Sequence, residues 1–356
     1  MNSVQRSYRT LVYITLFLTL DLIMFGAFVR LSDSGLGCPD WPGCYGKLSP
    51  FGARHFIEQA QLAMPYGPVS WGKAWIEMAH RYVGAILGLL IIAIVYMAWR
   101  HRQALGQSAW LATVCLVAVC LQGAFGAWTV THQLMPIIVT AHLLGGMTVL
   151  ALMSCLATRA TPYASASFAS RRYRPLLVAG CLMLFVQIAL GGWVSTNYAA
   201  LACMDFPRCH GQWLPAMDFS KAYSLWRPLG SLSTGEALPQ QALTAIHWVH
   251  RNVAWLVFAL LGTAAFRLRP DPALRPYATV ILALLLAQLL TGLSTIFFQW
   301  PLLIAVLHTG GAAALVLSSV TMLVRLSSPS LFSQGKRYAE SVSCPAFSTA
   351  SVSGTD

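Results

Sequence analysis

Eight apolar stretches, each about the length needed to cross a lipid bilayer, dominate this chain of 356 residues. A membrane-spanning helix needs about 20 mostly apolar residues. Only 10% of the residues are charged, against about 25% in a typical soluble domain. The sequence therefore predicts an all-α polytopic membrane protein. The expected spans are residues 10–30, 75–98, 109–130, 138–158, 175–195, 244–266, 277–299 and 302–324.

The first apolar stretch is interpreted as a retained span, because it has no small-residue cleavage site of the kind that ends a signal peptide. It contains Asp21, and an ionisable residue inside a span is costly unless it is paired or faces a polar interior. The net charge of +12 could suggest nucleic-acid binding. The basic residues cluster between the spans, however, as a topology signal does. We therefore expect a lipid bilayer, and no nucleic acid, as a partner.

The distribution of basic residues predicts that both termini lie in the cytoplasm. Of the 23 Lys and Arg residues, 14 lie on the face that the termini share with the short connections. The long segments 31–74 and 196–243 then lie outside. Residues 326–356 are Ser-rich and are expected to form a disordered cytoplasmic tail. The 14 basic residues are Arg6, Arg9, Arg100, Arg102, Arg159, Arg171, Arg172, Arg174, Arg267, Arg269, Arg275, Arg325, Lys336 and Arg337.

One segment of the sequence occurs twice, 165 residues apart. Residues 26–46 read GAFVRLSDSGLGCPDWPGCYG, and residues 191–211 read GGWVSTNYAALACMDFPRCHG. Each copy belongs to a half with four spans, and an even number of spans gives both halves the same orientation. We expect two tandem, pseudo-symmetric four-helix bundles related by an axis along the membrane normal. The expected units are residues 1–160 and 161–325.

Four of the histidines inside expected spans recur as matching pairs. His80 and His142 lie in the first half, and His250 and His308 lie in the second, all at a similar depth on spans that run inward. Two imidazoles at matched depth on two helices of one bundle can bind a haem iron from both sides. We predict that all four are iron ligands. Zinc is a weaker candidate, because structural zinc prefers four Cys or His ligands together.

Glu77 is the acidic residue of the spans that lies near these histidines. It precedes His80 by three residues and shares its helix face. His247 occupies the matching position in the second half, so either His247 or His250 could be the ligand there, and the repeat favours His250. Buried carboxylates in membranes are usually functional, so the first half is predicted to do chemistry and the second to support it. The alternative is that Glu77 merely pairs with Arg81 or caps its helix.

An arginine follows the first histidine of each pair, Arg81 in one half and Arg251 in the other. Neighbouring residues point in directions about 100° apart on a helix, so each arginine faces away from its histidine. It could reach the outer surface or pair with a haem propionate.

Each outer segment carries one Cys-x5-Cys pair, Cys38 with Cys44 and Cys203 with Cys209. Thiols oxidise outside the cytoplasm, and the short spacer closes a small ring easily. Two structural disulfides are the first interpretation. The alternative is a redox-active pair near the outer-facing site.

Together these residues resemble the haem A synthase family. The motifs that carry the resemblance are residues 26–46, EMAHR at 77–81, QGAFGAWTV at 122–130, TAHLLGG at 140–146, WVHRN at 248–252 and LHTGG at 307–311. The resemblance extends over nearly all of the chain to about residue 325. It implies an eight-helix oxidoreductase of the cell inner membrane that oxidises the C8 methyl group of haem O to a formyl group, giving haem A for terminal oxidases.

The resemblance also implies roles for particular residues. Substrate haem O would lie between His80 and His142, and a haem b cofactor between His250 and His308, with Glu77 as the catalytic carboxylate. The cysteine pairs match the subset of the family that carries them. The implied partners are haem O synthase, which is a farnesyltransferase, and an unidentified electron-transfer partner.

Two other functions are compatible with the sequence. A bis-His membrane cytochrome of the b type would use the four histidines equally well, but it needs neither Glu77 nor the difference between the halves. A two-repeat transporter would use the histidines as proton or substrate relays.

Overall fold

Eight long helices cross the molecule, as the apolar stretches predict. The computed structural model describes residues 2–164 and 166–327, so residues 328–356 of the predicted tail lie outside the described residues. All eight helices are long and apolar enough to span a membrane. They are α1 (Ser3–Leu31), α3 (Trp71–Arg100), α5 (Trp110–Thr131), α6 (Pro136–Arg159), α7 (Arg174–Thr196), α9 (Gln240–Leu268), α10 (Arg275–Phe297) and α11 (Leu302–Ser327).

Helix α1 begins seven residues before its predicted start, and its first turn explains the difference. The Asn2 side chain accepts a hydrogen bond from the Gln5 amide at 2.8 Å, and the Gln5 side chain accepts one from the Asn2 amide at 3.2 Å. This reciprocal capping satisfies backbone donors that a helix start otherwise leaves open. The polar first turns therefore extend the apolar span. Asp21 is exposed on α1 and does not line the cavity described below.

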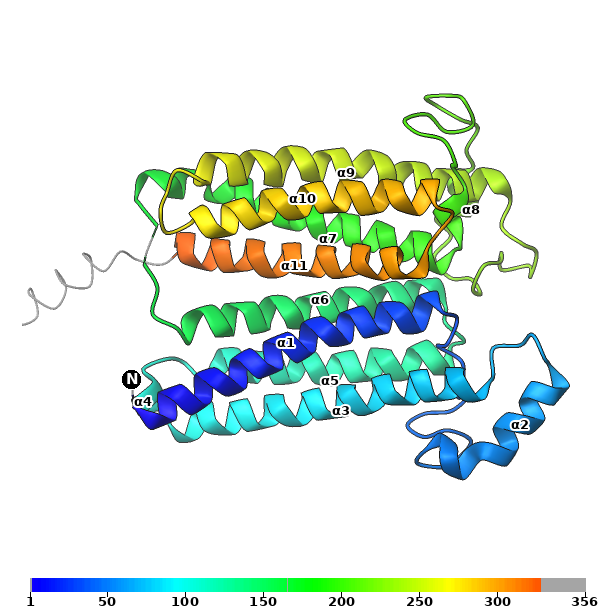
Figure 1. The fold of residues 1–356 in the computed structure, drawn as a ribbon, viewed down its shortest axis with the longest axis horizontal. Coiled ribbons are helices and arrows are strands. Elements are labelled where there is room, and N and C mark those ends of the chain that lie inside the picture. Colours follow the sequence, from blue (N-terminus) through cyan, green and yellow to red (C-terminus); the bar gives the residue numbers. More distant parts are fainter. Residues whose placement is uncertain (1, 165, 328–356) are drawn as a thin grey trace, which may run out of the picture.

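The helices form two groups of four that lie side by side (Figure 1). One group contains α1, α3, α5 and α6, and the other contains α7, α9, α10 and α11. Helices α1 and α6 of the first group contact α11 of the second, and α6 also contacts α7. This arrangement matches the predicted all-α architecture and is consistent with two tandem halves.

Polar contacts join the two copies of the duplicated segment at matching positions. The Arg30 guanidinium donates a hydrogen bond to the Ser195 carbonyl at 2.8 Å, and the Tyr198 hydroxyl donates one to Asp33 at 3.0 Å. In both pairs the partners are 165 residues apart. Contacts between equivalent positions occur where two related units meet across a two-fold axis. They are consistent with the predicted pseudo-symmetry.

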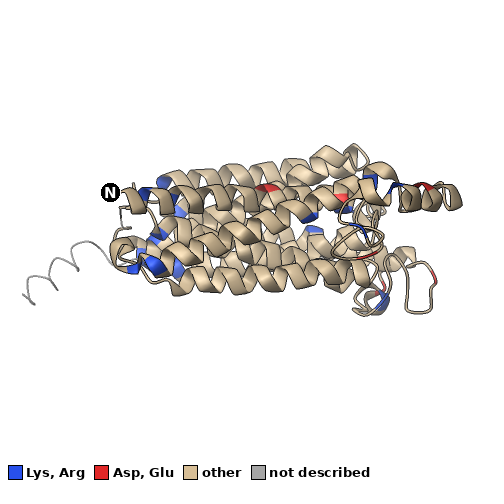
Figure 2. Cartoon of the chain, turned by 90° about the horizontal axis from the view of Figure 1, so that it is seen from below, with Lys and Arg blue, Asp and Glu red and all other residues tan. Residues whose placement is uncertain are grey.

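The long connections lie together at the end of the bundle opposite the N-terminus (Figure 1). The first carries α2 (Arg54–Ala63), and the second carries α8 (Phe219–Ala222). Basic residues gather at the end where the N-terminus lies (Figure 2). The remaining short elements are η1 (Pro50–Ala53), α4 (Arg102–Leu105), η2 (Ala169–Tyr173) and η3 (Ala199–Leu201).

The tightest apolar packing lies toward the N-terminal end of the bundle. Tyr8, Val12 and Leu16 from the first half of α1 are buried there, together with Ile91 and Ile94 from the second half of α3. The same cluster reaches into α6, α7, α9, α10 and α11. Close packing of this kind holds membrane helices together, because lipid provides no hydrophobic drive for association. The opposite end of the bundle is less filled and contains the cavity.

Candidate functional site

A cavity of about 790 Å³ lies between the helices near the outer loops and continues from one group of helices into the other. Its size is within the range of about 300–1,000 Å³ that small-molecule sites occupy. All four predicted ligand histidines line it: His80, His142, His250 and His308. Glu77 also lines the cavity, and among the described residues it is the one carboxylate that does so.

The four predicted ligand histidines, called the cavity histidines below, each pack against a glycine of a neighbouring helix. A methyl group placed on any of these glycines would lie 3.0–3.4 Å from the imidazole ring, so a larger side chain would displace the histidine. Each glycine lies five residues before the last residue of its helix, which places the four rings at similar depth. The pairs are Gly26 with His80, Gly126 with His142, Gly191 with His250, and Gly292 with His308.

The two histidines of each half line the cavity from different helices, as the repeat predicts. Each pair joins two helices of one group, α3 with α6 and α9 with α11. Facing imidazoles from two helices are the arrangement that binds a flat macrocycle between them.

Glu77 and His247 occupy matching positions and make the same contact with the outer loop of their half. The Cys38 amide donates a hydrogen bond to Glu77 Oε2 at 2.9 Å. The Cys203 amide donates one to His247 Nδ1 at 3.2 Å. Both side chains are buried, at 4% and 5% exposure. His247 also lines the cavity, but it is held to the loop through Nδ1.

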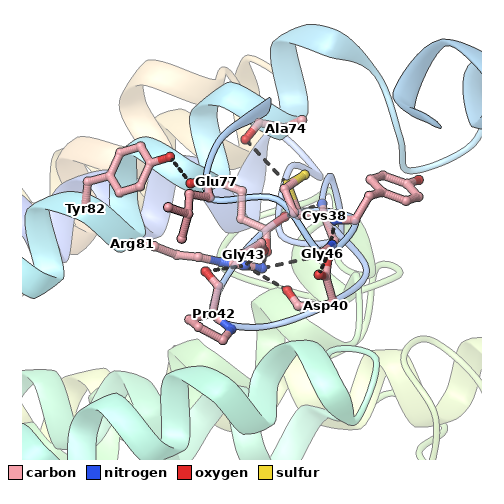
Figure 3. Close-up of a disulfide and its surroundings, with 12 residues drawn as sticks. Cys38, Asp40, Pro42, Gly43, Gly46, Ala74, Glu77, Arg81 and Tyr82 are labelled. Carbon is pink, nitrogen blue, oxygen red and sulfur yellow. Dashed lines mark hydrogen bonds and ion pairs between the residues drawn. A yellow bond between two sulfur atoms is a disulfide. The ribbon is translucent and has the colours of Figure 1, made fainter. Parts of the chain in front are cut away.

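Arg81 extends from α3 into the first outer loop and holds it in place (Figure 3). Its guanidinium pairs with Glu77 Oε1 at 2.5 Å and donates hydrogen bonds to the carbonyls of Gly43 at 2.5 Å and Asp40 at 2.8 Å. It adds a longer contact with the Cys38 carbonyl at 3.5 Å. The pairing of Glu77 with Arg81 that the sequence suggested is thus present. Arg81 is bound to the carbonyls of the outer loop. The sequence had suggested the outer surface or a haem propionate for it, and did not predict this contact.

Arg251 makes fewer contacts in the second half. It donates hydrogen bonds to the carbonyls of Arg208 at 3.2 Å and Pro207 at 3.4 Å, and its guanidinium lies 5.3 Å from the centre of the Phe206 ring. Its buried Nη1 has no hydrogen-bond partner within the described parts of the chain. Arg251 lines the cavity, so it can offer a donor to an anionic group there.

The outer loops carry the two predicted disulfides, Cys38–Cys44 and Cys203–Cys209. In both loops an aspartate organises the turn between the cysteines and the following glycine. Asp205 accepts hydrogen bonds from the amides of His210 at 2.8 Å and Gly211 at 2.9 Å. Asp40 does the same for the amides of Tyr45 at 2.6 Å and Gly46 at 2.7 Å. The duplicated sequence therefore has a duplicated local structure.

Three glutamines in the cavity lining, Gln122, Gln187 and Gln288, were not anticipated from the sequence. Each precedes a histidine-facing glycine by four residues, in QGAFG, QIALG and QLLTG. Residues four apart share a helix face, so the threefold recurrence of Gln-x3-Gly is the signal that could have found them.

The residues of the cavity fit a haem. Four imidazoles project in pairs, and the glycine facing each ring removes the side chain that would otherwise fill the space beside it. The buried Nδ1 of His142 has no hydrogen-bond partner in residues 2–164 and 166–327, and neither has Nη1 of Arg251. Paired neutral imidazoles suit iron in a macrocycle better than an isolated divalent ion, which would need further protein ligands.

The fold and the cavity define a class of protein, namely polytopic α-helical membrane proteins with paired histidines inside the helix bundle. The chain belongs to the COX15-CtaA family of cytochrome oxidase assembly proteins, whose model matches residues 9–320. It is 38% identical over 314 residues to a protein from Shewanella oneidensis named heme A synthase, which covers 88% of this chain and 94% of the relative. A protein of the same name from Halalkalibacterium halodurans is 27% identical over 296 residues, covering 81% and 86%.

Proposed function

We propose that this chain is a haem A synthase, an oxidoreductase that converts the C8 methyl group of haem O to the formyl group of haem A for cytochrome oxidase assembly. Family membership over residues 9–320 supports this function. The observation that carries it is the cavity, in which two histidine pairs lie together and only the first pair has a carboxylate beside it.

The two halves of the cavity hold different haems. His80 and His142 bind the substrate haem O within residues 1–160. His250 and His308 bind haem b within residues 161–325. His250 is preferred over His247 because it matches His80 in the repeat and its ring lies against Gly191, as the other three predicted ligands lie against a glycine.

The conversion of a methyl into a formyl group takes up the oxygen of one water and releases four protons and four electrons. Haem b supplies one-electron chemistry when it is bound. Glu77 is the proton acceptor, because it is the carboxylate in the cavity lining and lies one helical turn from His80. Arg81 and the Cys38 amide hold the two carboxylate oxygens and so fix where the proton is taken up.

The orientation of the protein in the membrane is inferred from its basic residues, and its partners are inferred from its proposed function. The basic end of the bundle, where the N-terminus lies, faces the cytoplasm (Figure 2), and the disulfide loops face outward from the cell inner membrane. Haem O synthase, the farnesyltransferase that makes the substrate, and an electron-transfer protein are its partners. Arg251 offers its Nη1 to a haem propionate.

The experiment that tests this function is pigment extraction from the purified protein after co-expression with a source of haem O. We expect haem b together with haem O and haem A, and haem A in the membranes only when the chain is present. Recovery of haem b alone would contradict the proposal and favour an electron-transfer cytochrome. A protein without Soret absorbance would contradict it in favour of a transporter.

A further inference from the structure

Three of the four cavity histidines are held in place by a glutamine of the neighbouring helix. In each case the glutamine Nε2 donates a hydrogen bond to the backbone carbonyl of the histidine. These bonds are Gln122 to His142 at 2.7 Å, Gln187 to His250 at 3.0 Å, and Gln288 to His308 at 3.0 Å. The glutamine amides lie between packed helices, so each bond fixes a histidine-bearing helix against its neighbour at the level of the cavity.

The local sequence makes room for these amides. A side chain on Gly145, three residues after His142, would collide with the Gln122 amide, and one on Gly311 would collide with the Gln288 amide. A glycine at each of these positions therefore admits the glutamine between the helices. Both helices therefore contribute to this contact, one with the glutamine and the other with the glycine that leaves room for it.

In the second half the imidazole rings are held as well as the backbone. Gln187 Nε2 lies 3.1 Å from His250 Nδ1. Thr291 Oγ1 lies 2.8 Å from His308 Nδ1. The Thr291 hydroxyl donates its own hydrogen to the Ala287 carbonyl at 2.8 Å, so its lone pair can accept from His308 Nδ1–H, which leaves Nε2 for a metal. An acceptor of this kind orients a metal-binding histidine and strengthens its binding. The Gln187 amide is a donor, so its contact with His250 Nδ1 fixes the orientation of the ring but does not favour Nε2 as the metal-binding atom.

His80 lacks such a clamp. The residue four before its glycine, Gly26, is Leu22, whose side chain has no donor to offer. The ring of His80 is also turned differently, because a methyl group on Gly26 would lie nearest its Nε2, at 3.0 Å. At the other three glycines the nearest ring atom is Cε1.

We propose that His80 is the displaceable ligand of the substrate haem and that Leu22 is the positioning residue that leaves it displaceable. The inference rests on the proposed function, since it presupposes a haem between His80 and His142. His142, whose helix backbone is fixed by Gln122, would retain the haem. Glu77 lies one helical turn from His80, so it would border the position that a displaced His80 leaves open.

Carbon monoxide binding to the reduced, purified holoprotein tests this assignment, because carbon monoxide needs an open coordination position. Leu22→Gln restores the missing amide, and Leu22→Met is the control of similar size without a donor. Haem content per chain and the reduced-plus-carbon-monoxide difference spectrum are measured for each variant. We expect Leu22→Gln to slow carbon monoxide binding about tenfold or more, and Leu22→Met to behave as the unaltered protein.

A second variant tests the same idea in the other half and covers the case in which Leu22→Gln does not accumulate. Gln288→Leu combined with Thr291→Val removes both the amide that holds the His308 backbone and the hydroxyl that holds its ring, and we expect a second haem that reacts with carbon monoxide. Unchanged carbon monoxide binding in Leu22→Gln at full haem content, or no additional reactive haem in this double variant, would overturn the inference. Failure of the proposed function looks different, because pigment extraction from the unaltered protein would then give haem b alone or no haem at all.

Discussion

The junctions between helix and outer loop in the two halves share one structural task and differ in chemistry. In the first half a carboxylate, Glu77, accepts the hydrogen bond of the Cys38 amide, and in the second half an imidazole, His247, accepts that of Cys203. Docking of the loop thus requires an acceptor at this position and does not require a negative charge. The carboxylate goes beyond what the fold needs, which supports a chemical role for Glu77 over a purely structural one.

The largest effect is expected from removing the negative charge of Glu77. Glu77→Gln keeps an oxygen that can accept from the Cys38 amide but can no longer take up a proton. We expect haem A formation to fall by roughly 10²–10⁴-fold, the usual contribution of a general acid or base, with haem content unchanged. The matched variant His247→Gln keeps an acceptor for Cys203 and should leave haem A formation nearly intact. Equal losses in both variants, measured by pigment extraction, would refute the distinction between the halves.

A smaller effect is expected from filling the space beside a first-half histidine. Gly126→Val places methyl groups against the His142 ring, where even a Cβ would lie 3.1 Å from Cε1. Overpacking of this kind typically costs about 1–3 kcal/mol, which corresponds to roughly tenfold weaker binding or more. We expect reduced occupancy by haem O with haem b retained.

The control for this variant is Gly88→Val on α3. Nothing lies within 4 Å of a Cβ placed at Gly88, and this residue does not line the cavity. Its haem content should match the unaltered protein. If both valines lowered haem O occupancy equally, the effect would reflect the loss of helical glycine and not the contact with His142.

The smallest effect concerns the second outer loop and its pH dependence. Hydrogen bonds from the backbone amides of Gly211 and His210 hold the pKa of Asp205 below its ordinary value. Its contribution to loop stability is therefore present above the ordinary aspartate pKa, about 3.9, and is lost as the pH falls through the depressed folded value. We expect Asp205→Asn to increase proteolysis of this loop slightly at neutral pH and to reduce its further sensitivity to acid. An acid sensitivity identical to that of the unaltered protein would contradict this role.

The histidines, Glu77 and the helices could be predicted because hydropathy, repeat register and helical spacing are properties of the sequence itself. The roles of Arg81 and the glutamines could not. Arg81 reaches carbonyls of residues about 40 positions away, and the path of that loop is set by the disulfide and by Asp40, not by local propensity. Gln122 and Gln288 look like ordinary polar residues of apolar helices until the backbone carbonyl they contact, 20 residues on, is known.

The extent of α1 shows the same limit on a smaller scale. Hydropathy marks the apolar part of this helix, but the capping pair of Asn2 and Gln5 extends it into a polar segment. The hydrogen bonds between each side chain and the backbone amide of the other residue determine where the helix begins.

The haem composition of His142→Ala and His308→Ala, purified in parallel from cells that make haem O, tests the division of roles between the halves most directly. We expect His142→Ala to lose haem O and haem A while it keeps haem b. We expect His308→Ala to lose haem b and to retain haem O that is not converted. Loss of haem b from His142→Ala, or conversion of haem O at the normal level in His308→Ala, would contradict a reacting first half served by a supporting second half.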